Sequence, residues 1–173
     1  MHGSRPPPSG VSMELLANDR KSLGVSSFDQ FYQEERTQQV RRAFLLLGCA
    51  DAAHDVVAES FTQVLRRWSD ISEPGPYLNR CVLNGCRSAG RMRTERGTSP
   101  LETAPPEVTA SSEETVEFAH LLIELPFKQR AAIVCRYYGG LTENEIAKLL
   151  ECRPGTVGPL IYRGLNKLRE DLT

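Results

Sequence analysis

The chain has 173 residues, of which 40% are hydrophobic and 25% are charged, and a formal net charge of −1 at pH 7. This size and composition fit one ordinary globular domain or two small ones. No run of about eighteen apolar residues is present, which argues against a membrane span. Residues 1–10 are polar and proline-rich, without the apolar core of a secretory signal. We therefore expect a cytoplasmic protein without membrane insertion.

The cysteines and histidines do not form a pattern that suits chemistry. The five cysteines contain no CxxC pair, and the three histidines are scattered. Buried, reduced thiols explain them better than a metal site or a redox switch. The chain also lacks a glycine-rich phosphate loop and any convincing pairing of histidine with cysteine. We expect no metal, no cofactor and no enzymatic activity.

The first predicted elements are a flexible extension and two helices. Residues 1–27 contain prolines and glycines, carry little apolar pattern and are predicted to be flexible. An apolar helical pattern then begins at Phe28 and runs to Gly48, a suitable C-terminal cap. Asp51 is predicted to cap the start of the second helix. The buried stripe of that helix is expected to comprise Val57, Phe61, Val64, Leu65 and Trp68.

A third helix and a linker follow a predicted turn at residues 72–76. The helix starts near Tyr77 and ends in a cluster of arginines at positions 87, 91, 93 and 96. Residues 97–113 then have the proline, serine and glutamate content of an acidic linker. The small net charge therefore conceals a basic segment beside an acidic one.

The last third of the chain is predicted to contain a helix-turn-helix. Thr142 and Glu145 form a capping box at the start of its first helix. A break at residues 151–155 follows, with Pro154 suited to the first position of the second helix. The apolar stripe of that helix is expected to be Val157, Ile161, Leu165, Leu168 and Leu172. Its flanks are basic, as in a helix that enters the DNA major groove.

Together these elements predict an all-α fold, since no convincing strand or repeat appears. We expect a flexible extension at residues 1–27 and a three- to four-helix domain at 28–96. A flexible linker at 97–113 then leads to a helix-turn-helix domain at 114–173.

Two blocks of residues, in this order and across such a linker, resemble the bacterial sigma factors of the extracytoplasmic-function type. Those proteins have only the second and fourth sigma domains. In the second domain the resemblance rests on Asp51, Asp55, residues 59–61, Trp68, Tyr77, Leu78, Asn84 and the basic tail. In the fourth it rests on residues 125–126, Arg130, 136–142, 145–147, 155–157 and 163–165. It covers residues 28–173.

The resemblance implies a transcription initiation factor that binds core RNA polymerase, selects promoters through their −10 and −35 elements, and helps to open the duplex. The implied docking sites are the clamp helices of the largest catalytic subunit and the flap of the second-largest subunit. Asp55, Glu59 and Arg66 are implied to dock on the clamp helices. The linker is similar to family linkers that pass through the polymerase's RNA channel. Relatives are commonly held by an anti-sigma protein, which adds one to the candidate partners.

The resemblance also implies two sets of DNA contacts. The third helix and its preceding turn would meet the non-template strand at −10 through Tyr77, Arg80, Asn84, Arg87 and Arg91. Arg80, Asn84 and Arg87 share one helical face, where arginine contacts phosphate and asparagine reads a base edge. The candidate −35 contacts are Thr156, Tyr162, Arg163 and Lys167.

Two segments depart from the family pattern. His54 and Ala58 stand where relatives usually have an acidic residue and a glutamine, so docking on the clamp helices is expected to be weaker or rearranged. Gly-Pro-Leu at residues 158–160 replaces a basic residue, a serine and another basic residue in the recognition helix. Pro159 costs about 3 kcal/mol if that helix stays regular. We therefore expect a kink and an altered, weak −35 readout.

Two other classes of protein stay open on the sequence. A different helix-turn-helix regulator, such as a response-regulator-type activator, would explain the last third of the chain but not residues 28–96. A sigma-like protein that has lost promoter recognition and acts by protein contact would explain Gly158 and Pro159.

Overall fold

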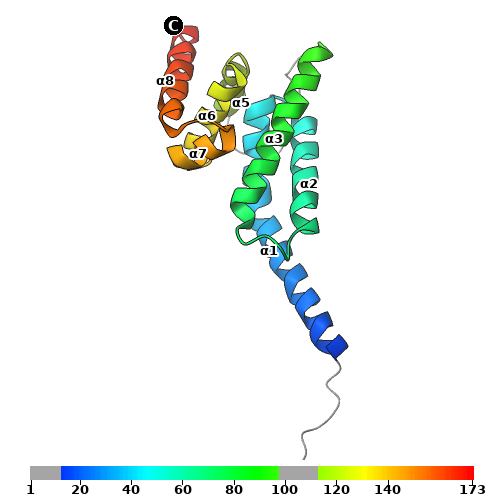
Figure 1. Cartoon of the computed structure of the whole chain (residues 1–173). Helices are drawn as coiled ribbons and strands as arrows, with labels where there is room; N and C mark the ends of the chain where they lie inside the picture. The colour runs from blue at the N-terminus through cyan, green and yellow to red at the C-terminus, as the bar shows by residue number, and fades with distance from the viewer. Residues whose placement is uncertain (1–12, 98–112) are drawn as a thin grey trace, which may run out of the picture.

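The computed structural model describes residues 13–97 and 113–173, and within these ranges the chain is helical without strands (Figure 1). The predicted all-α fold class is confirmed. The helices are α1 (Met13–Leu47), α2 (Ala50–Arg66), α3 (Pro74–Glu95), α5 (Glu113–Ile123), α6 (Phe127–Tyr137), α7 (Glu143–Leu150) and α8 (Pro154–Asp171). None of these described helices has the length and apolar character needed to cross a membrane.

Helices α1, α2 and α3 form an N-terminal unit around an aliphatic and aromatic core. Phe44, Val57 and Leu78 are almost completely buried in it, because each belongs to an apolar face with helical spacing. Trp68 packs edge-on against Phe28, with ring centroids 5.3 Å apart. Trp68 is therefore a packing residue, as its place on the apolar stripe predicts.

Helix α2 differs from the prediction at two positions. It begins at Ala50 with Cys49 as the N-cap residue, so Asp51 lies in the first turn and does not cap the helix. The Asp51 carboxylate is still favourable there, because a helix N-terminus attracts negative charge. Leu65, predicted to be buried, is 49% exposed. It follows the buried Val64 directly, and successive residues of a helix point about 100° apart.

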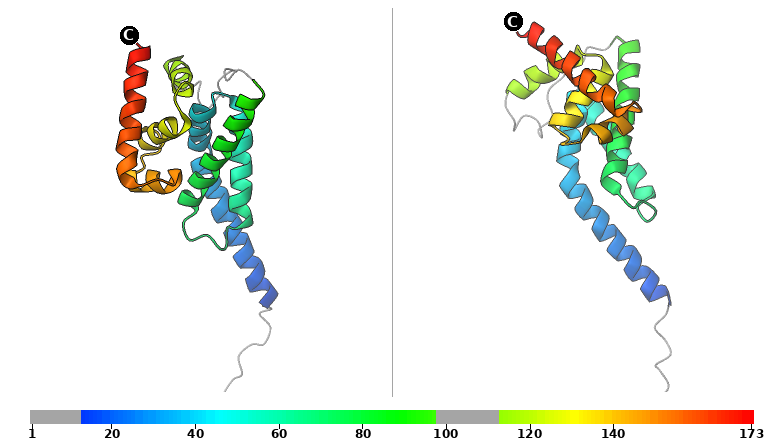
Figure 2. Two further views of the ribbon diagram at one scale, coloured as in Figure 1. Left: turned by 45° about the horizontal axis from the view of Figure 1, so that its top comes forward. Right: turned by 60° about the vertical axis from the view of Figure 1, so that its left-hand side comes forward.

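The predicted flexible extension is wrong for residues 13–27, because α1 begins at Met13 and continues unbroken into the buried part of the N-terminal unit. Residues 13–17 are Met-Glu-Leu-Leu-Ala, all good helix formers. A helix that is already nucleated adds such residues at little cost. The first turns of α1 project away from the other helices (Figures 1 and 2). Residues 1–12 lie outside the described part of the chain.

Helix α3 sets the start of the predicted linker. It begins at Pro74, not near Tyr77, because proline is favoured in the first turn of a helix. It ends before Gly97, whose φ of +63° is a left-handed conformation that suits glycine. Residues 98–112 lie outside the described residues, so the flexible linker stays a prediction.

Helices α5 to α8 form a C-terminal unit that contains the predicted helix-turn-helix. Helix α7 begins with the capping box of Thr142 and Glu145. It ends at Glu151, whose φ of +53° turns the chain sharply toward α8. Pro154 occupies the first turn of α8, as predicted.

The buried face of α8 differs in part from the predicted stripe. It consists of Val157, Leu160, Gly164 and Leu168. Ile161 and Leu165 are half-buried, and Leu172 is 70% exposed. The predicted stripe is wrong at Leu172, which follows the last helical residue of α8 and leaves the packed part of the unit.

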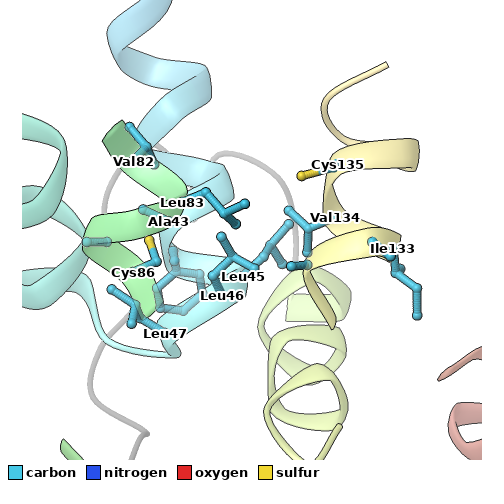
Figure 3. Close-up of a cluster of buried hydrophobic side chains, with 14 of the residues drawn as sticks. Ala43, Leu45, Leu46, Leu47, Val82, Leu83, Cys86, Ile133, Val134 and Cys135 are labelled. Atoms are coloured by element: carbon cyan, nitrogen blue, oxygen red, sulfur yellow. The ribbon is translucent and has the colours of Figure 1, made fainter. Parts of the chain in front are cut away.

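The two units pack against each other along a seam. We define the seam by five side chains, all at most 8% exposed: Leu45, Leu46, Leu83, Val134 and Cys135. Figure 3 shows Leu45 and Leu83 from the N-terminal unit and Val134 from α6 in the space between the helices. Helix α2 lies on the far side of the N-terminal unit, away from α7 and α8 (Figures 1 and 2).

Hydrogen bonds reinforce the seam at both ends of α6. At its start, Arg130 donates from Nη1 to the carbonyl of Leu46 and from Nη2 to the carbonyl of Leu125 at 3.1 Å. At its end, the carbonyl of Tyr138 accepts from Arg42 Nε at 3.2 Å and from Gln38 Nε2 at 3.4 Å. The end of α1 therefore holds α6 by polar contacts as well as by apolar packing.

Candidate nucleic-acid interface

The predicted −10 residues do not all share one exposed surface. Arg80, Asn84 and Arg91 are exposed along α3, so their side chains are accessible to a ligand. Arg87 is half-buried, and its guanidinium lies 5.7 Å from the centroid of the Phe127 ring in α6. The structure therefore brings three of the helical candidates to the surface and places Arg87 where α3 and α6 meet.

Tyr77 lines a surface hollow at the start of α3. The hollow has a volume of about 590 Å³ and lies between the end of α2 and the first turns of α3. Tyr77 and Arg80 form one wall, and Arg67, Ile71 and Pro76 also line it. Arg67 is absent from the sequence-based candidates, although its place off the buried stripe of α2 could have indicated it.

The predicted polymerase-docking residues share the outer surface of α2. Asp55, Glu59 and Arg66 are all exposed, at helical spacings that repeat about every turn. The Glu59 carboxylate accepts a hydrogen bond from Gln63 Nε2 at 3.4 Å. The exposed Leu65 adds an apolar side chain to this charged surface, which the sequence analysis missed by placing it in the core.

The predicted −35 residues lie in three settings on α8. Tyr162 is 67% exposed, and Arg163 is exposed, with its Nε donating to the carbonyl of Pro159 at 3.2 Å. Thr156 is half-buried near the start of the helix. Lys167 donates from Nζ to the carbonyl of Glu124 at 2.9 Å. Lys167 therefore closes the loop after α5, a role that its sequence position does not indicate.

Pro159 lies inside α8, and the helix continues through it from Pro154 to Asp171. Proline has no backbone N–H, so this turn lacks the hydrogen bond to the carbonyl of Gly155. Apart from its chain neighbours and the nearby backbone of α8, no described atom lies within 4 Å of the position where a Cβ of Gly155 would be. The predicted kink stays a prediction.

The capping box fixes the start of α7 and hence the turn between α7 and α8. The Glu145 carboxylate accepts from the Thr142 backbone N–H and from its hydroxyl, both at 2.8 Å. The Glu145 N–H donates to Thr142 Oγ1 at 3.3 Å. The hydrogen bonds from Thr142 hold the pKa of Glu145 below its usual range.

A close helix crossing positions α8 on the rest of the C-terminal unit. A Cβ at Gly164 would lie 2.7 Å from Cδ1 of Ile133 on α6. Glycine at this position therefore permits a close approach of the two helices. This contact fixes which face of α8, with Tyr162 at its centre, is directed outward.

All five cysteines lie in the described part of the chain and none forms a disulfide; three of them are buried: Cys49, Cys86 and Cys135. Burial raises the pKa of the Cys135 thiol to about 11 and that of Cys86 further. Among the described residues, no group of three or more His, Cys, Asp or Glu side chains is arranged to hold a metal ion. The buried thiols confirm the structural interpretation of these three cysteines.

Comparison with known proteins indicates which class of protein has this two-unit helical fold. The family described as "Sigma-70, region 4" matches residues 115–168, which cover most of the C-terminal unit. The co-crystal structure of the sigma factor RpoE with the anti-sigma factor NepR from Bartonella quintana shares the fold. It has a TM-score of 0.68 and 23% identity, and the match covers 83% of this chain and 96% of that one. The class is therefore that of a two-unit helical protein with a sigma-type helix-turn-helix.

Sequence relatives make the assignment more specific. The chain is 28% identical over 178 residues to the ECF RNA polymerase sigma factor SigE of Mycolicibacterium smegmatis, a match covering 95% of this chain and 68% of the relative. It is 26% identical to the RNA polymerase sigma-E factor of Streptomyces coelicolor, with 86% and 87% covered. The chain is therefore similar to the extracytoplasmic-function group of RNA polymerase sigma factors. These are transcription initiation factors and not enzymes.

Proposed function

We propose that this sigma factor directs core RNA polymerase to promoters with a −10 and a −35 element, and that α3 reads the first and α8 the second. The observation that carries this proposal is the presence of one exposed, basic helix face on each unit. Arg80, Asn84 and Arg91 provide it on α3, and Tyr162 and Arg163 provide it on α8. Arginine contacts to phosphate supply affinity, whereas the Asn84 amide can both donate to and accept from a base.

Promoter melting is assigned to the hollow at the start of α3. A base that leaves the duplex needs a surface on which to stack and cations near its phosphate. Tyr77 offers the aromatic ring, and the charged lining of the hollow consists of two basic residues, Arg67 and Arg80, and two acidic ones, Asp70 and Glu73. We therefore place one unpaired base of the non-template strand in this hollow.

Polymerase binding is assigned to the outer surface of α2 for the clamp helices and to the C-terminal unit for the flap. Asp55, Glu59 and Arg66 supply charge on α2, and Leu65 supplies the apolar area that interfaces concentrate at their centre. In the family pattern an acidic residue is usual where His54 stands, so the resemblance implies one carboxylate fewer on this surface. An anti-sigma protein is a further partner, by analogy with the RpoE–NepR complex.

Promoter binding requires the packed units to separate. The two elements are centred about 25 base pairs apart, or about 85 Å at 3.4 Å per pair. Each unit has a radius of gyration of roughly 12 Å, so units in contact cannot reach both elements. Residues 98–112 can span at most about 50 Å when extended, which together with the two units matches the separation.

The −35 readout is the weaker of the two. Gly158 and Pro159 place no polar side chain on the outward face of α8, and Lys167 is occupied by the carbonyl of Glu124. This favours one alternative function, a sigma factor that works by protein contact with little −35 recognition.

The test is to sequence the DNA retained by the reconstituted holoenzyme and then to use that promoter in run-off transcription. We expect a transcript that requires both core polymerase and this chain. We also expect that −10 changes reduce it more than −35 changes do. A transcript that also needs another sigma factor would indicate a regulator, and no transcript at all would indicate the contact-only alternative.

A further inference from the structure

A pocket of about 550 Å³ lies between the two units, where α3, the end of α1 and the start of α6 meet. Its volume is within the range of small-molecule sites. Five of its lining side chains are cationic: Arg87, Arg91, Arg93, Lys128 and Arg130. Its apolar lining includes Leu46, Leu47, Leu125 and Phe127. No Asp or Glu is among the lining residues that the structure describes.

Two of the guanidinium groups are held on one aromatic ring. Arg87 and Arg130 lie 5.7 and 5.8 Å from the centroid of Phe127, a distance typical of cation–π contacts. Such a contact leaves the N–H groups, which lie in the guanidinium plane, available to other partners. In Arg130, Nη1 and Nη2 already donate to backbone carbonyls and Nε remains. One guanidinium group from each unit therefore lies beside Phe127, and all three side chains line the pocket.

Both of these arginines retain unsatisfied donors. Nη2 of Arg87 and Nε of Arg130 are buried and have no hydrogen-bond partner among the described residues. Buried donors on a charged group are normally paired, because leaving them unpaired costs free energy. Burial also lowers the pKa of Arg130, so its cationic form is poorly solvated there. An oxyanion that enters the pocket would bring a partner of matching charge close to these arginines.

We propose that this pocket binds a small molecule carrying a pyrophosphate or bisphosphate group. Adjacent phosphates present several oxygens and at least two charges, which match the paired arginines and the flanking Arg91 and Lys128. The apolar lining provides room for an uncharged body attached to the phosphates.

The pocket exists only while the units are packed, because its cations come from α3 on one unit and α6 on the other. A ligand that binds only this arrangement stabilises it by mass action. The ligand would therefore hold Arg87 at the seam and delay the separation of the units.

The direct test is isothermal titration of the full chain with inorganic pyrophosphate, at constant ionic strength and without divalent metals. We expect saturable binding of one pyrophosphate per chain, at least tenfold tighter than that of inorganic phosphate. The double variant Arg91→Ala and Lys128→Ala removes two exposed cations of the lining and should weaken binding at least tenfold.

The matched control is the double variant Lys148→Ala and Arg169→Ala, which removes two exposed cations outside the pocket. We expect less than a threefold change in affinity. Equal losses in the two double variants would show general charge attraction and overturn the proposal, as would titration of the unmodified chain without saturation. Circular dichroism confirms that each variant is folded.

A third variant tests whether both units are needed. Val134→Asp places a carboxylate in the seam without touching the pocket lining, and it should abolish saturable binding by separating the units. Unchanged affinity in this variant, with an increased radius of gyration in small-angle X-ray scattering, would overturn a pocket shared between the units. None of these measurements uses polymerase or promoter DNA, so their failure is distinct from failure of the proposed function.

Discussion

The two helices assigned to DNA, α3 and α8, differ in what limits them. Helix α3 has a suitable set of side chains, but Arg87 is engaged with Phe127 of the other unit. Helix α8 has an exposed outer face with Tyr162 and Arg163, but Gly158 and Pro159 add no polar side chain to it, and Pro159 removes one backbone hydrogen bond. Access to α3 therefore depends on how the units pack, whereas DNA recognition by α8 depends on its own sequence.

This difference implies that the two promoter contacts respond to different changes. Substitutions in the seam alter the availability of α3 and leave α8 as it is. Substitutions within α8 alter its stability and DNA contacts without separating the units. The following experiments test this separation, in order of decreasing expected effect.

Val134→Asp is expected to have the largest effect. An unpaired carboxylate at this almost fully buried position would oppose packing of the units by roughly 3–5 kcal/mol. We expect a larger radius of gyration in small-angle X-ray scattering while the helical content is retained. Val134→Ala, which loses only apolar contact worth about 2 kcal/mol, is the control. A folded Val134→Asp chain with an unchanged radius of gyration would contradict the role of the seam.

Arg130→Ala should come next. This side chain donates to the carbonyls of Leu46, Ile123 and Leu125, and hydrogen bonds from charged groups contribute about 1.5–3 kcal/mol. We expect the free energy of unfolding in urea to fall by about 2–3 kcal/mol. Arg130→Lys keeps the charge without the fork of donors, so it should lose nearly as much. An unchanged urea midpoint in both variants would show that these bonds do not stabilise the fold.

Pro159→Ala tests whether Pro159 limits the stability of α8 and its recognition of −35 DNA. Alanine restores the backbone donor and has the best helix propensity, so we expect a gain in stability of roughly 1–3 kcal/mol. Binding to −35 DNA should tighten in the same variant, as measured by fluorescence anisotropy. Pro154→Ala is the matched control, because proline is tolerated in the first turn. Equal responses of the two variants would remove Pro159 as the cause of weak recognition.

Thr142→Ala should have a smaller effect, because it removes only the side-chain half of the capping box. Loss of an N-cap costs about 1 kcal/mol, and we expect thermal denaturation to show a correspondingly lower melting temperature. Thr142→Ser, which keeps the hydroxyl, should restore most of the loss. A Thr142→Ser chain as unstable as Thr142→Ala would mean that the methyl group, and not the cap, matters.

Glu145 should give the smallest effect, and it depends on pH. Its pKa in the folded chain is lowered by hydrogen bonds from Thr142. Its contribution to stability is therefore complete above its pKa in the unfolded chain and is lost as pH falls through the folded value. We expect the stability difference between the unmodified chain and Glu145→Gln to shrink on acidification through this window. A difference that grows in acid would contradict the assignment.

Features that depend on neighbouring residues in the sequence could be predicted. The capping box at Thr142 and Glu145 and the start of α8 at Pro154 were correct because each follows from residues within one turn. The exposed charges of α2 and α3 followed from helical periodicity in the same way. Side chains whose contacts lie within about one helical turn of the sequence are therefore the ones whose positions the sequence predicts.

Features that depend on contacts between distant segments could not be predicted. No local signal indicates that Arg87 meets Phe127, forty residues later, or that Lys167 binds the carbonyl of Glu124. The extension differs from its prediction for another reason. The prolines of residues 1–27 all precede Met13, where a run of helix formers begins.

The buried thiol of Cys135 offers a chemical measure of how often the two units separate. Cys135 lies in the seam beside Arg42 and is nearly inaccessible to solvent. Its pKa of about 11 leaves almost no thiolate near neutral pH, and the thiolate is the form that alkylating reagents attack. Modification of Cys135 therefore waits for moments when the two halves part. The rate of Cys135 modification would therefore report how often the units separate in the unmodified sequence, without a probe introduced beforehand.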